Sequence, residues 1–122
     1  MLDKLFDGKK IIHKALDASW KRNEAIAQNI ANVDTPGYKR KSVSFEDELR
    51  KAMDSKDFKK SDVDQIEIKV VEENKNLSMR LDGNNVDIEA EMAELAKNTI
   101  KYNALVQMAG FDKLKMVIKE GK

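Results

Sequence analysis

The feature that most constrains this chain is its single proline, Pro36, which is followed directly by Gly37. Proline presets the φ angle of the second residue of a type II β-turn, and glycine accepts the positive φ that the third residue requires. Asn32 and Asp34, just before this pair, have short side chains that can cap backbone groups at a helix end. The sequence therefore predicts that a helix ends near Ala31 or Asn32 and that a defined turn follows.

A heptad pattern leads into this turn. Its positions alternate between spacings of four and three residues, at Ile12, Leu16, Ser19, Asn23, Ile26, Ile30 and Val33. This spacing is typical of a helix that packs in a narrow stripe against partner helices. Polar residues at the centre of such a stripe lower stability but specify register and partner number. We expect a helix that begins at Lys9 or Lys10 and ends at Ala31 or Asn32.

A second heptad stripe lies near the other end of the chain, at Ile88, Met92, Leu95, Thr99, Tyr102, Val106 and Ala109. Asp87 is a suitable N-cap for this helix, and it follows a turn signal at residues 82–85. Gly110 interrupts the pattern at a cost of about 1 kcal/mol relative to alanine. Such a glycine indicates either a bend or a close approach of another backbone.

The segment between the two helices has a different character. Ser44, with Asp47 three residues later, approaches capping-box spacing and predicts a short helix from Phe45 to about Met53. The charge-rich stretch 54–64 predicts a solvated loop or a disordered segment. Alternating apolar and polar residues over 66–70 and 77–81 predict the two strands of a β-hairpin.

The predicted fold is therefore mainly α. Two long terminal helices pair as an antiparallel, coiled-coil-like hairpin, and a small insert with a short helix and a β-hairpin projects from one end. The expected divisions are residues 1–38 for the N-terminal axial helix and turn motif, 39–81 for the middle insert, and 82–122 for the C-terminal axial helix.

Composition argues against several classes of function. The 122 residues carry 23 lysines and arginines against 22 aspartates and glutamates, so a general nucleic-acid binder is disfavoured. There is no cysteine, hence no disulfide and no cysteine-ligated zinc. Charged residues make up 37% of the chain, which favours long exposed helices over one large core. We find no apolar stretch long enough for a membrane span or a cleaved secretory signal, and we expect a soluble protein without membrane insertion.

Residues that could carry chemistry are few. His13 is the only histidine, and no glycine-rich phosphate loop occurs. The carboxylates lie near lysines and arginines, and we interpret them as solvated helix faces. The basic triplet of residues 39–41 favours an exposed loop over a phosphate contact. Trp20 lies one residue past a seam position, where packing against another helix or subunit is expected. We predict no catalytic, cofactor-binding or metal site and no small-molecule substrate.

Two motifs carry a family resemblance. Asn29-Ile30-Ala31-Asn32 followed by Asp34-Thr35-Pro36-Gly37-Tyr38 resembles the signature of bacterial flagellar axial proteins. The run from Asp82 to Ala96, which opens the C-terminal helix, resembles the flagellar basal-body rod proteins, and among them the proximal rod subunit. The resemblance covers roughly residues 12–53 and 82–118.

This resemblance implies a structural, non-enzymatic subunit. Such subunits polymerise helically, with copies of themselves and with other rod proteins, into the drive shaft for motility that crosses the periplasm. The implied further partners are the base of the basal body, on its MS-ring and export-gate side, and the flagellar type III export apparatus. Export would leave no cleaved signal. Two alternatives remain open at this point, a sister rod subunit and a cytoplasmic helical coiled-coil adaptor.

The resemblance also implies which residues form the site. The expected assembly motif, which sets the helix end and the exit angle of the chain, comprises Asn29, Asn32, Asp34, Thr35, Pro36, Gly37 and Tyr38. The expected packing interface, buried between helices or subunits, comprises Ile12, Leu16, Ile26, Ile30, Met92, Leu95, Tyr102 and Val106.

Overall fold

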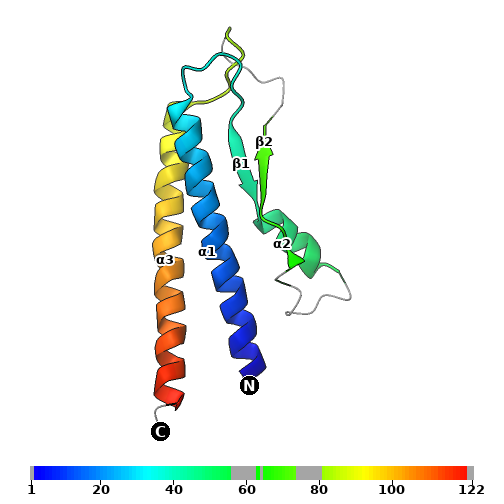
Figure 1. Ribbon diagram of the computed structural model, residues 1–122, viewed down its shortest axis with the longest axis vertical. Helices are drawn as coiled ribbons and strands as arrows, with labels where there is room; N and C mark the ends of the chain where they lie inside the picture. The colour runs from blue at the N-terminus through cyan, green and yellow to red at the C-terminus, as the bar shows by residue number, and fades with distance from the viewer. Residues whose placement is uncertain (1, 56–62, 64, 74–80, 121–122) are drawn as a thin grey trace.

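The computed structural model describes residues 2–55, 63, 65–73 and 81–120, and for residues 2–9 and 111–120 it describes only the backbone. Its elements are α1 (Leu2–Ala31), β1 (Lys41–Ser44), α2 (Glu46–Met53), β2 (Lys69–Glu72) and α3 (Ile88–Glu120). The two long helices run side by side in opposite directions, with both chain ends at one end of the pair (Figure 1). The predicted mainly helical fold with paired terminal helices is confirmed.

Helix α1 is longer than predicted, because it begins at Leu2 and not at Lys9 or Lys10. The heptad rule detects only the part of a helix that carries a stripe. Leucine and lysine, which recur in residues 2–9, favour a helix even without a stripe, and the helix continues through Gly8.

The sequence predicts that the insert projects from one end of the helix pair, and this prediction is wrong. The insert folds back along α1, which lies between α3 and the β1–α2–β2 insert (Figure 1). A small core joins the two, formed by Ala18 of α1 with Phe45 and Ile66 of the insert. The partly buried residues around this core are Ala15, Leu49, Ala52 and Ile68.

The predicted β-hairpin has the wrong pairing. β2 pairs antiparallel with β1, in a register that runs from Lys41 opposite Glu72 to Ser44 opposite Lys69. Of the second predicted strand, residues 77–80 lie outside the described residues, and Leu81 is part of a turn. β1 has the sequence Lys-Ser-Val-Ser, whose single apolar residue gives no strand signal. Of the predicted charged loop, residues 56–62 and 64 also lie outside the described residues.

The predicted cap of α2 is also wrong. Phe45 occupies the N-cap position, and no side chain caps the helix. Ser44 cannot do so because it belongs to β1, opposite Lys69. Burial of Phe45 anchors the start of this helix instead. The negative charges of the acidic residues in its first turn also interact favourably with the positive end of the helix dipole.

Helix α3 starts as predicted. The Oδ1 atom of Asp87 accepts a hydrogen bond from the backbone N–H of Glu89 at 3.0 Å, so Asp87 caps the helix. The helix continues through Gly110, and no described atom outside the local helix backbone lies within 4 Å of a Cβ placed there. Of the two alternatives for this glycine, a bend or a close approach of another backbone, the close approach is not found among the described residues.

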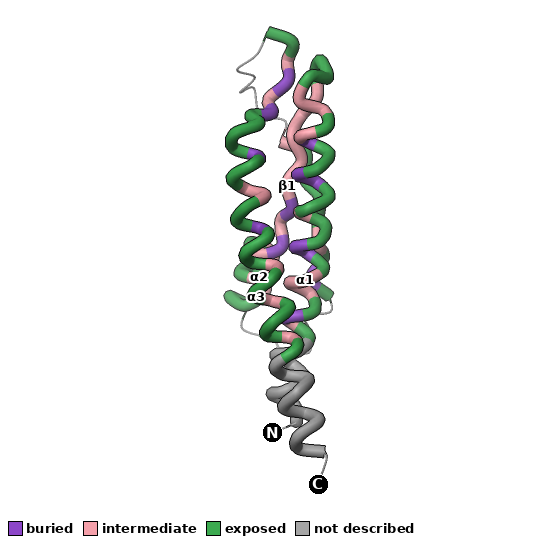
Figure 2. The backbone as a smooth tube through the Cα atoms, turned by 90° about the vertical axis from the view of Figure 1, so that its left-hand side faces the viewer, coloured by how far each residue is buried: buried purple, intermediate pink, exposed green. Residues whose placement is uncertain are grey.

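The stripe by which α3 packs on α1 differs from the predicted one. Glu91 and Asn98 are buried and bond to residues of α1, and Leu95 and Tyr102 are half-buried. Figure 2 shows the backbone of α3 coloured by burial. Ile88, Met92 and Val106, predicted for the seam, are 47%, 55% and 45% exposed. Their face is rotated by roughly a quarter of a turn from the packed one, at 3.6 residues per turn. A hydrophobic pattern misses the packed face because polar side chains hold its centre.

Candidate assembly site

The turn motif has the predicted geometry. The N–H of Tyr38 donates to the carbonyl of Thr35 at 3.3 Å, and Gly37 has a φ of +75°. These values define a type II turn across Pro36 and Gly37. The N–H of Gly37 also donates to the carbonyl of Asp82 at 2.7 Å. The turn motif therefore meets the segment that precedes α3.

Asn84 of that segment caps the end of α1. Its buried Nδ2 donates to the carbonyls of Asn32, Val33 and Thr35, at 2.9, 3.0 and 2.8 Å. Its Oδ1 accepts from the N–H of Val86 at 2.7 Å. Carbonyls at a helix C-terminus have no partner within the helix. The two N–H groups of one amide, from the far end of the chain, are thus shared among three carbonyls just beyond this helix end.

Asn29 uses its whole amide. Its Nδ2 donates to the carbonyl of Lys41 at 2.9 Å and to Glu91 Oε2 at 3.1 Å. Its Oδ1 accepts from the N–H of Lys41 at 2.8 Å and from the hydroxyl of Tyr38 at 3.1 Å. An amide side chain has two donor hydrogens and two acceptor lone pairs, so this buried side chain is fully satisfied. Asn29 thus bonds both the backbone carbonyl and the backbone N–H of Lys41, as a residue of a neighbouring β-strand would.

The hydroxyl of Tyr38 stays protonated and can therefore donate. Burial raises the pKa of Tyr38 above its usual value of 10.0, and the carboxylates of Glu91 and Glu72 raise it further.

Arg40 joins the insert to α3. Its Nε lies 2.6 Å from Oε1 of Glu91, a side chain that is only 1% exposed, and its Nη1 lies 2.7 Å from Oε1 of Glu73. Burial alone would lower the pKa of Arg40, but the hydrogen bonds and charges of Glu91 and Glu73 raise it above the usual value. The Arg40 backbone N–H donates to Oδ1 of Asn85 at 2.6 Å. We call Asn29, Tyr38, Arg40, Asn84, Asn85 and Glu91 the head cluster.

Two interpretations from the sequence are therefore wrong. The basic triplet is not an exposed loop: Lys39 donates to the Gly83 carbonyl, Arg40 binds Glu91, and Lys41 Nζ donates to Gln28 Oε1 at 3.1 Å. Glu91 is not part of a solvated helix face. Sequence reasoning missed Arg40, Asn84, Asn85 and Glu91 because their partners lie far away along the chain, and no local pattern signals such pairs.

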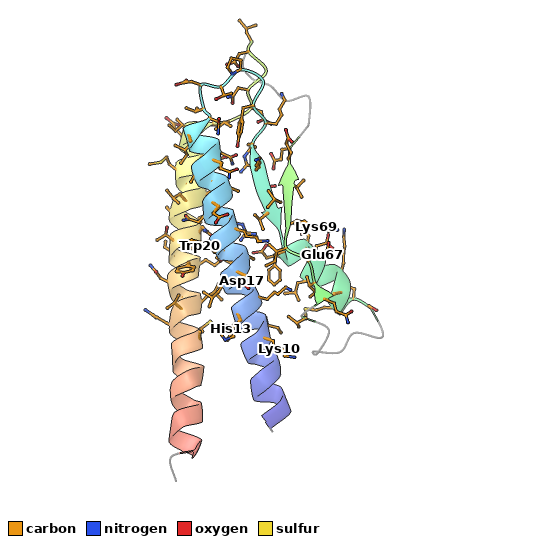
Figure 3. All side chains as sticks on the ribbon, viewed as in Figure 1. Lys10, His13, Asp17, Trp20, Glu67 and Lys69 are labelled. Atoms are coloured by element: carbon orange, nitrogen blue, oxygen red, sulfur yellow. The ribbon has the colours of Figure 1, made fainter. Side chains whose placement is uncertain are left out.

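Farther along the helix pair, α1 and α3 contact each other through the polar residues Ser19 and Asn98. Asn98 Nδ2 donates to the backbone carbonyl of Ser19 at 3.0 Å. Ser19 Oγ and Asn98 Oδ1 are buried and have no hydrogen-bond partner in the described part of the chain. Both residues line a groove between the helices with Trp20, Asn23, Thr99 and Tyr102. Figure 3 shows Trp20 at the line where the two helices meet.

A protein-family model described as "Flagella basal body rod protein" matches residues 14–39, which include the turn motif. The flagellar basal body rod protein FlgB of Bacillus subtilis (strain 168) is 38% identical over 119 residues, which cover 91% of this chain and 92% of that protein. The chain belongs to the FlgB family of flagellar basal body rod proteins. FlgB of Borreliella burgdorferi is 36% identical over 126 residues, with 88% and 92% covered. FlgB of Escherichia coli (strain K12) is 29% identical over 120 residues, with 84% of each chain covered.

Membership in the FlgB family makes this chain a structural rod subunit and not an enzyme. It also favours this function over the sister-subunit and adaptor alternatives. Among the described residues, no cluster of histidine and acidic side chains is arranged to hold a metal ion. No described helix has the length and the apolar character needed to cross a membrane.

In this FlgB-family chain the predicted site residues fall into distinct environments. Of the expected assembly motif, Asn29 is buried, Asn32 and Tyr38 are half-buried, and the exposed members are Asp34, Thr35, Pro36 and Gly37. Of the expected packing interface, Ile12 and Ile26 are buried within the chain, Met92 and Val106 are exposed, and the half-buried members are Leu16, Ile30, Leu95 and Tyr102. Their part in assembly stays a prediction.

Proposed function

We propose that this chain is a proximal rod subunit, which polymerises helically with copies of itself and with other rod proteins into the drive shaft of the flagellum. The observation that carries this proposal is a helix pair with large apolar side chains left uncovered. Trp20 is 57% exposed, Met92 55% and Ile100 72%. Exposed apolar side chains along one helix pair fit contact with another protein, and the family of rod proteins implies assembly with other rod proteins.

In this proposal the N-terminal segment 1–38 and the C-terminal segment 82–122 act as axial parts, and 39–81 acts as an insert on their flank. The exposed packing residues Met92 and Val106 contact neighbouring subunits, together with the half-buried ones. The turn motif sets the angle at which the chain leaves α1, and the head cluster holds that angle by tying the turn to the start of α3.

We further propose that the subunit lies on the MS-ring and export-gate side of the rod, in the periplasmic space. It would reach that place through the flagellar type III export apparatus without a cleaved signal. The small apolar core around Ala18, Phe45 and Ile66 supports this route, because little buried surface must be exposed to unfold the chain for passage. The mass of the subunit recovered from basal bodies tests the absence of cleavage.

Two methionines of similar exposure test the proposed interface. Met92 lies on α3, and Met53, 60% exposed, lies on α2 of the insert. Each is replaced by glutamate in a strain whose only copy of the gene carries that change. We expect Met92→Glu to leave the folded monomer intact, because the side chain is already exposed, but to abolish swimming and remove the subunit from purified basal bodies.

Met53→Glu is the matched control, and it should swim and assemble as the wild type does. Recovery of the wild-type chain only in the cytoplasmic fraction would overturn the proposed function. So would normal basal bodies in the Met92→Glu strain.

A further inference from the structure

The two outer edges of the β1–β2 sheet have different surroundings. The edge of β1 faces α1 (Figure 1). There Asn29 bonds the N–H and the carbonyl of Lys41, and Arg22 Nη2 donates to the carbonyl of Val43 at 3.1 Å. Side chains of α1 thus take the place of a neighbouring strand along β1. No described strand lies beyond β2, and all of its residues are exposed.

The register determines which groups of β2 face this open edge. Opposite residues of an antiparallel pair alternate between pairs that exchange N–H···O bonds and pairs that do not. Glu73 donates its N–H to the carbonyl of Arg40 at 2.9 Å, so these two form a hydrogen-bonded pair. Along the register, Val71 then bonds β1, whereas the N–H and C=O groups of Val70 and Glu72 point outward. An exposed row of such groups is a template for another strand.

We propose that β2 of a second copy of this chain occupies this edge, antiparallel to the first, with the two Val71 residues directly opposite each other. In this register the outward N–H and C=O groups of Val70 bond those of Glu72 of the second copy, and the reverse. The result is a continuous sheet in the order β1, β2, β2, β1.

Charge complementarity favours this register over the two neighbouring ones that also bring outward groups together. With the Val71 residues opposite each other, Lys69 of each copy faces Glu73 of the other. A shift in one direction places Glu72 opposite Glu72, and a shift in the other direction places Glu67 opposite Glu73. Opposite charges across a strand pair stabilise it, and like charges destabilise it.

The side chains that this register pairs are accessible. Val70 is 52% exposed and Val71 42% exposed, and Lys69 is exposed as well. Glu73 is bonded to Arg40 through Oε1, at 2.7 Å. A carboxylate accepts several hydrogen bonds, so Glu73 can also accept one from Lys69 of the second copy.

A contact of β2 with itself is symmetric, so it closes at a dimer and joins copies that point in opposite directions. Copies in a helical shaft built from heterologous contacts all point the same way, so the β2 contact belongs to the free chain. It covers an edge strand that would otherwise be open to pairing with other chains. Because the interface is small, the association should be weak, and a covalent trap is the suitable measurement.

Disulfide trapping of the purified full-length chain tests the contact, because the natural chain has no cysteine. Val71→Cys places the two sulfurs across a pair whose Cα atoms lie about 4.5 Å apart, which a disulfide can span. Val70→Cys is the matched control, because it is the neighbouring exposed valine and its counterpart lies only diagonally across. In a glutathione redox buffer we expect several-fold more dimer from Val71→Cys. The two variants should give equal amounts when unfolded in urea.

A second measurement uses the charges. Two differently tagged copies both carry Val71→Cys, and one also carries Lys69→Glu while the other carries Glu73→Lys. In the second of these, Arg40 keeps its contact with Glu91. Each copy alone places like charges opposite each other and should form several-fold less dimer than Val71→Cys by itself. Mixed together, they present opposite charges again, and dimers that contain both tags should exceed those of either copy alone.

Equal dimer from the two cysteine variants in the folded chain would overturn the inference. More dimer from Val70→Cys would overturn it too, because that result indicates another register. Mixed dimers no more abundant than those of either charge variant alone would also contradict it. The proposed function is tested separately, by swimming and by the content of basal bodies, so the two failures are distinguishable.

Discussion

The head cluster and the helix pair below it solve the same problem, burial of polar groups, in opposite ways. In the head cluster, the buried side chains of Asn29, Asn84 and Glu91 all have partners. Between α1 and α3, Ser19 Oγ and Asn98 Oδ1 have none in the described part of the chain. The head cluster thus satisfies its buried side chains within one chain, whereas the described part of the helix pair leaves two buried oxygens without a partner.

Apolar side chains are divided less sharply. Trp20, Met92 and Ile100 are exposed along the helix pair, and Met53 and Val70 are exposed on the insert, which also packs Phe45 and Ile66 onto α1. The stability of the free chain should therefore depend on the head cluster and the insert. Assembly should depend on the helix pair. Substitutions in the head cluster or the insert should therefore change stability, whereas substitutions on the helix pair should change assembly.

The largest effect is expected where the head cluster holds a buried charge. Arg40→Met leaves the carboxylate of Glu91 buried without its cation, which should destabilise the free chain by about 3 kcal/mol or more. Urea unfolding of the purified protein measures this loss. The double variant Arg40→Met with Glu91→Gln should regain much of it, because no buried charge is then left unpaired. An unchanged unfolding midpoint in the single variant would show that the ion pair does not support the head cluster.

The next effect concerns the turn. Gly37 has a φ of +75°, and no described atom lies within 4 Å of a Cβ placed there. Gly37→Val should therefore destabilise by about 2 kcal/mol through backbone strain alone, since a left-handed conformation is costly for a β-branched residue. We also expect impaired rod assembly and swimming, because the exit angle of the chain changes. Wild-type stability together with intact basal bodies in this variant would count against the role of the motif.

Replacing a glycine of the helix pair should change the stability in the opposite direction. Gly110 lies inside α3 with open space around it, so Gly110→Ala should stabilise the free chain by about 1 kcal/mol. Gly37→Ala should destabilise it by a similar amount, about 1 kcal/mol. Thermal unfolding of the two variants side by side checks this contrast. The same sign for both would mean that backbone conformation does not distinguish the two regions.

The smallest effect lies where the insert meets both helices. Burial alone would raise the pKa of Glu46, but hydrogen bonds from Arg22 and Lys101 lower it from 4.5 to about 2. A lowered folded-state pKa contributes stability above pH 4.5 that is lost as the pH falls toward 2. Because Glu46 is 43% exposed, solvent screening limits this contribution to about 1 kcal/mol or less.

The corresponding test is Glu46→Gln, which should lower stability at neutral pH and flatten its fall between pH 4.5 and 2. Asp47→Gln, on the exposed side of α2, is the matched control and should change this profile less. Parallel profiles for the wild type and Glu46→Gln would show that the contact of the insert with the helices does not depend on this charge.

Much of the fold could be predicted from local patterns. The type II turn at Pro36 and Gly37, the N-cap at Asp87 and the short helix near Glu46 depend on neighbours within a few residues, and each is present. The pairing of β1 with β2 could not be predicted, because β1 has almost no apolar pattern of its own. The second contact face of α1 was missed too, since alanines such as Ala18 pack closely but give a weak hydrophobic signal.

The candidate site likewise contains features that local patterns predicted and features that they did not. The turn motif and the apolar stripes were visible in the sequence, but the polar partners that position them were not. Glu91 and Arg40 are separated by 51 positions, and Asn84 by 49 from the Thr35 carbonyl that it binds. A charged or amide residue has the same local appearance whether it faces solvent or is buried with a distant partner.

By itself, the sequence determined the two terminal helices, the place where α1 ends, the turn that follows, and two motifs that resemble the rod proteins. All of these follow from backbone preferences and periodicity over a few residues. Only the tertiary structure decided which face of α3 packs on α1, where the insert lies, and which polar groups are buried. Those outcomes depend on which distant side chains can satisfy one another out of water, and local patterns contain no information about that.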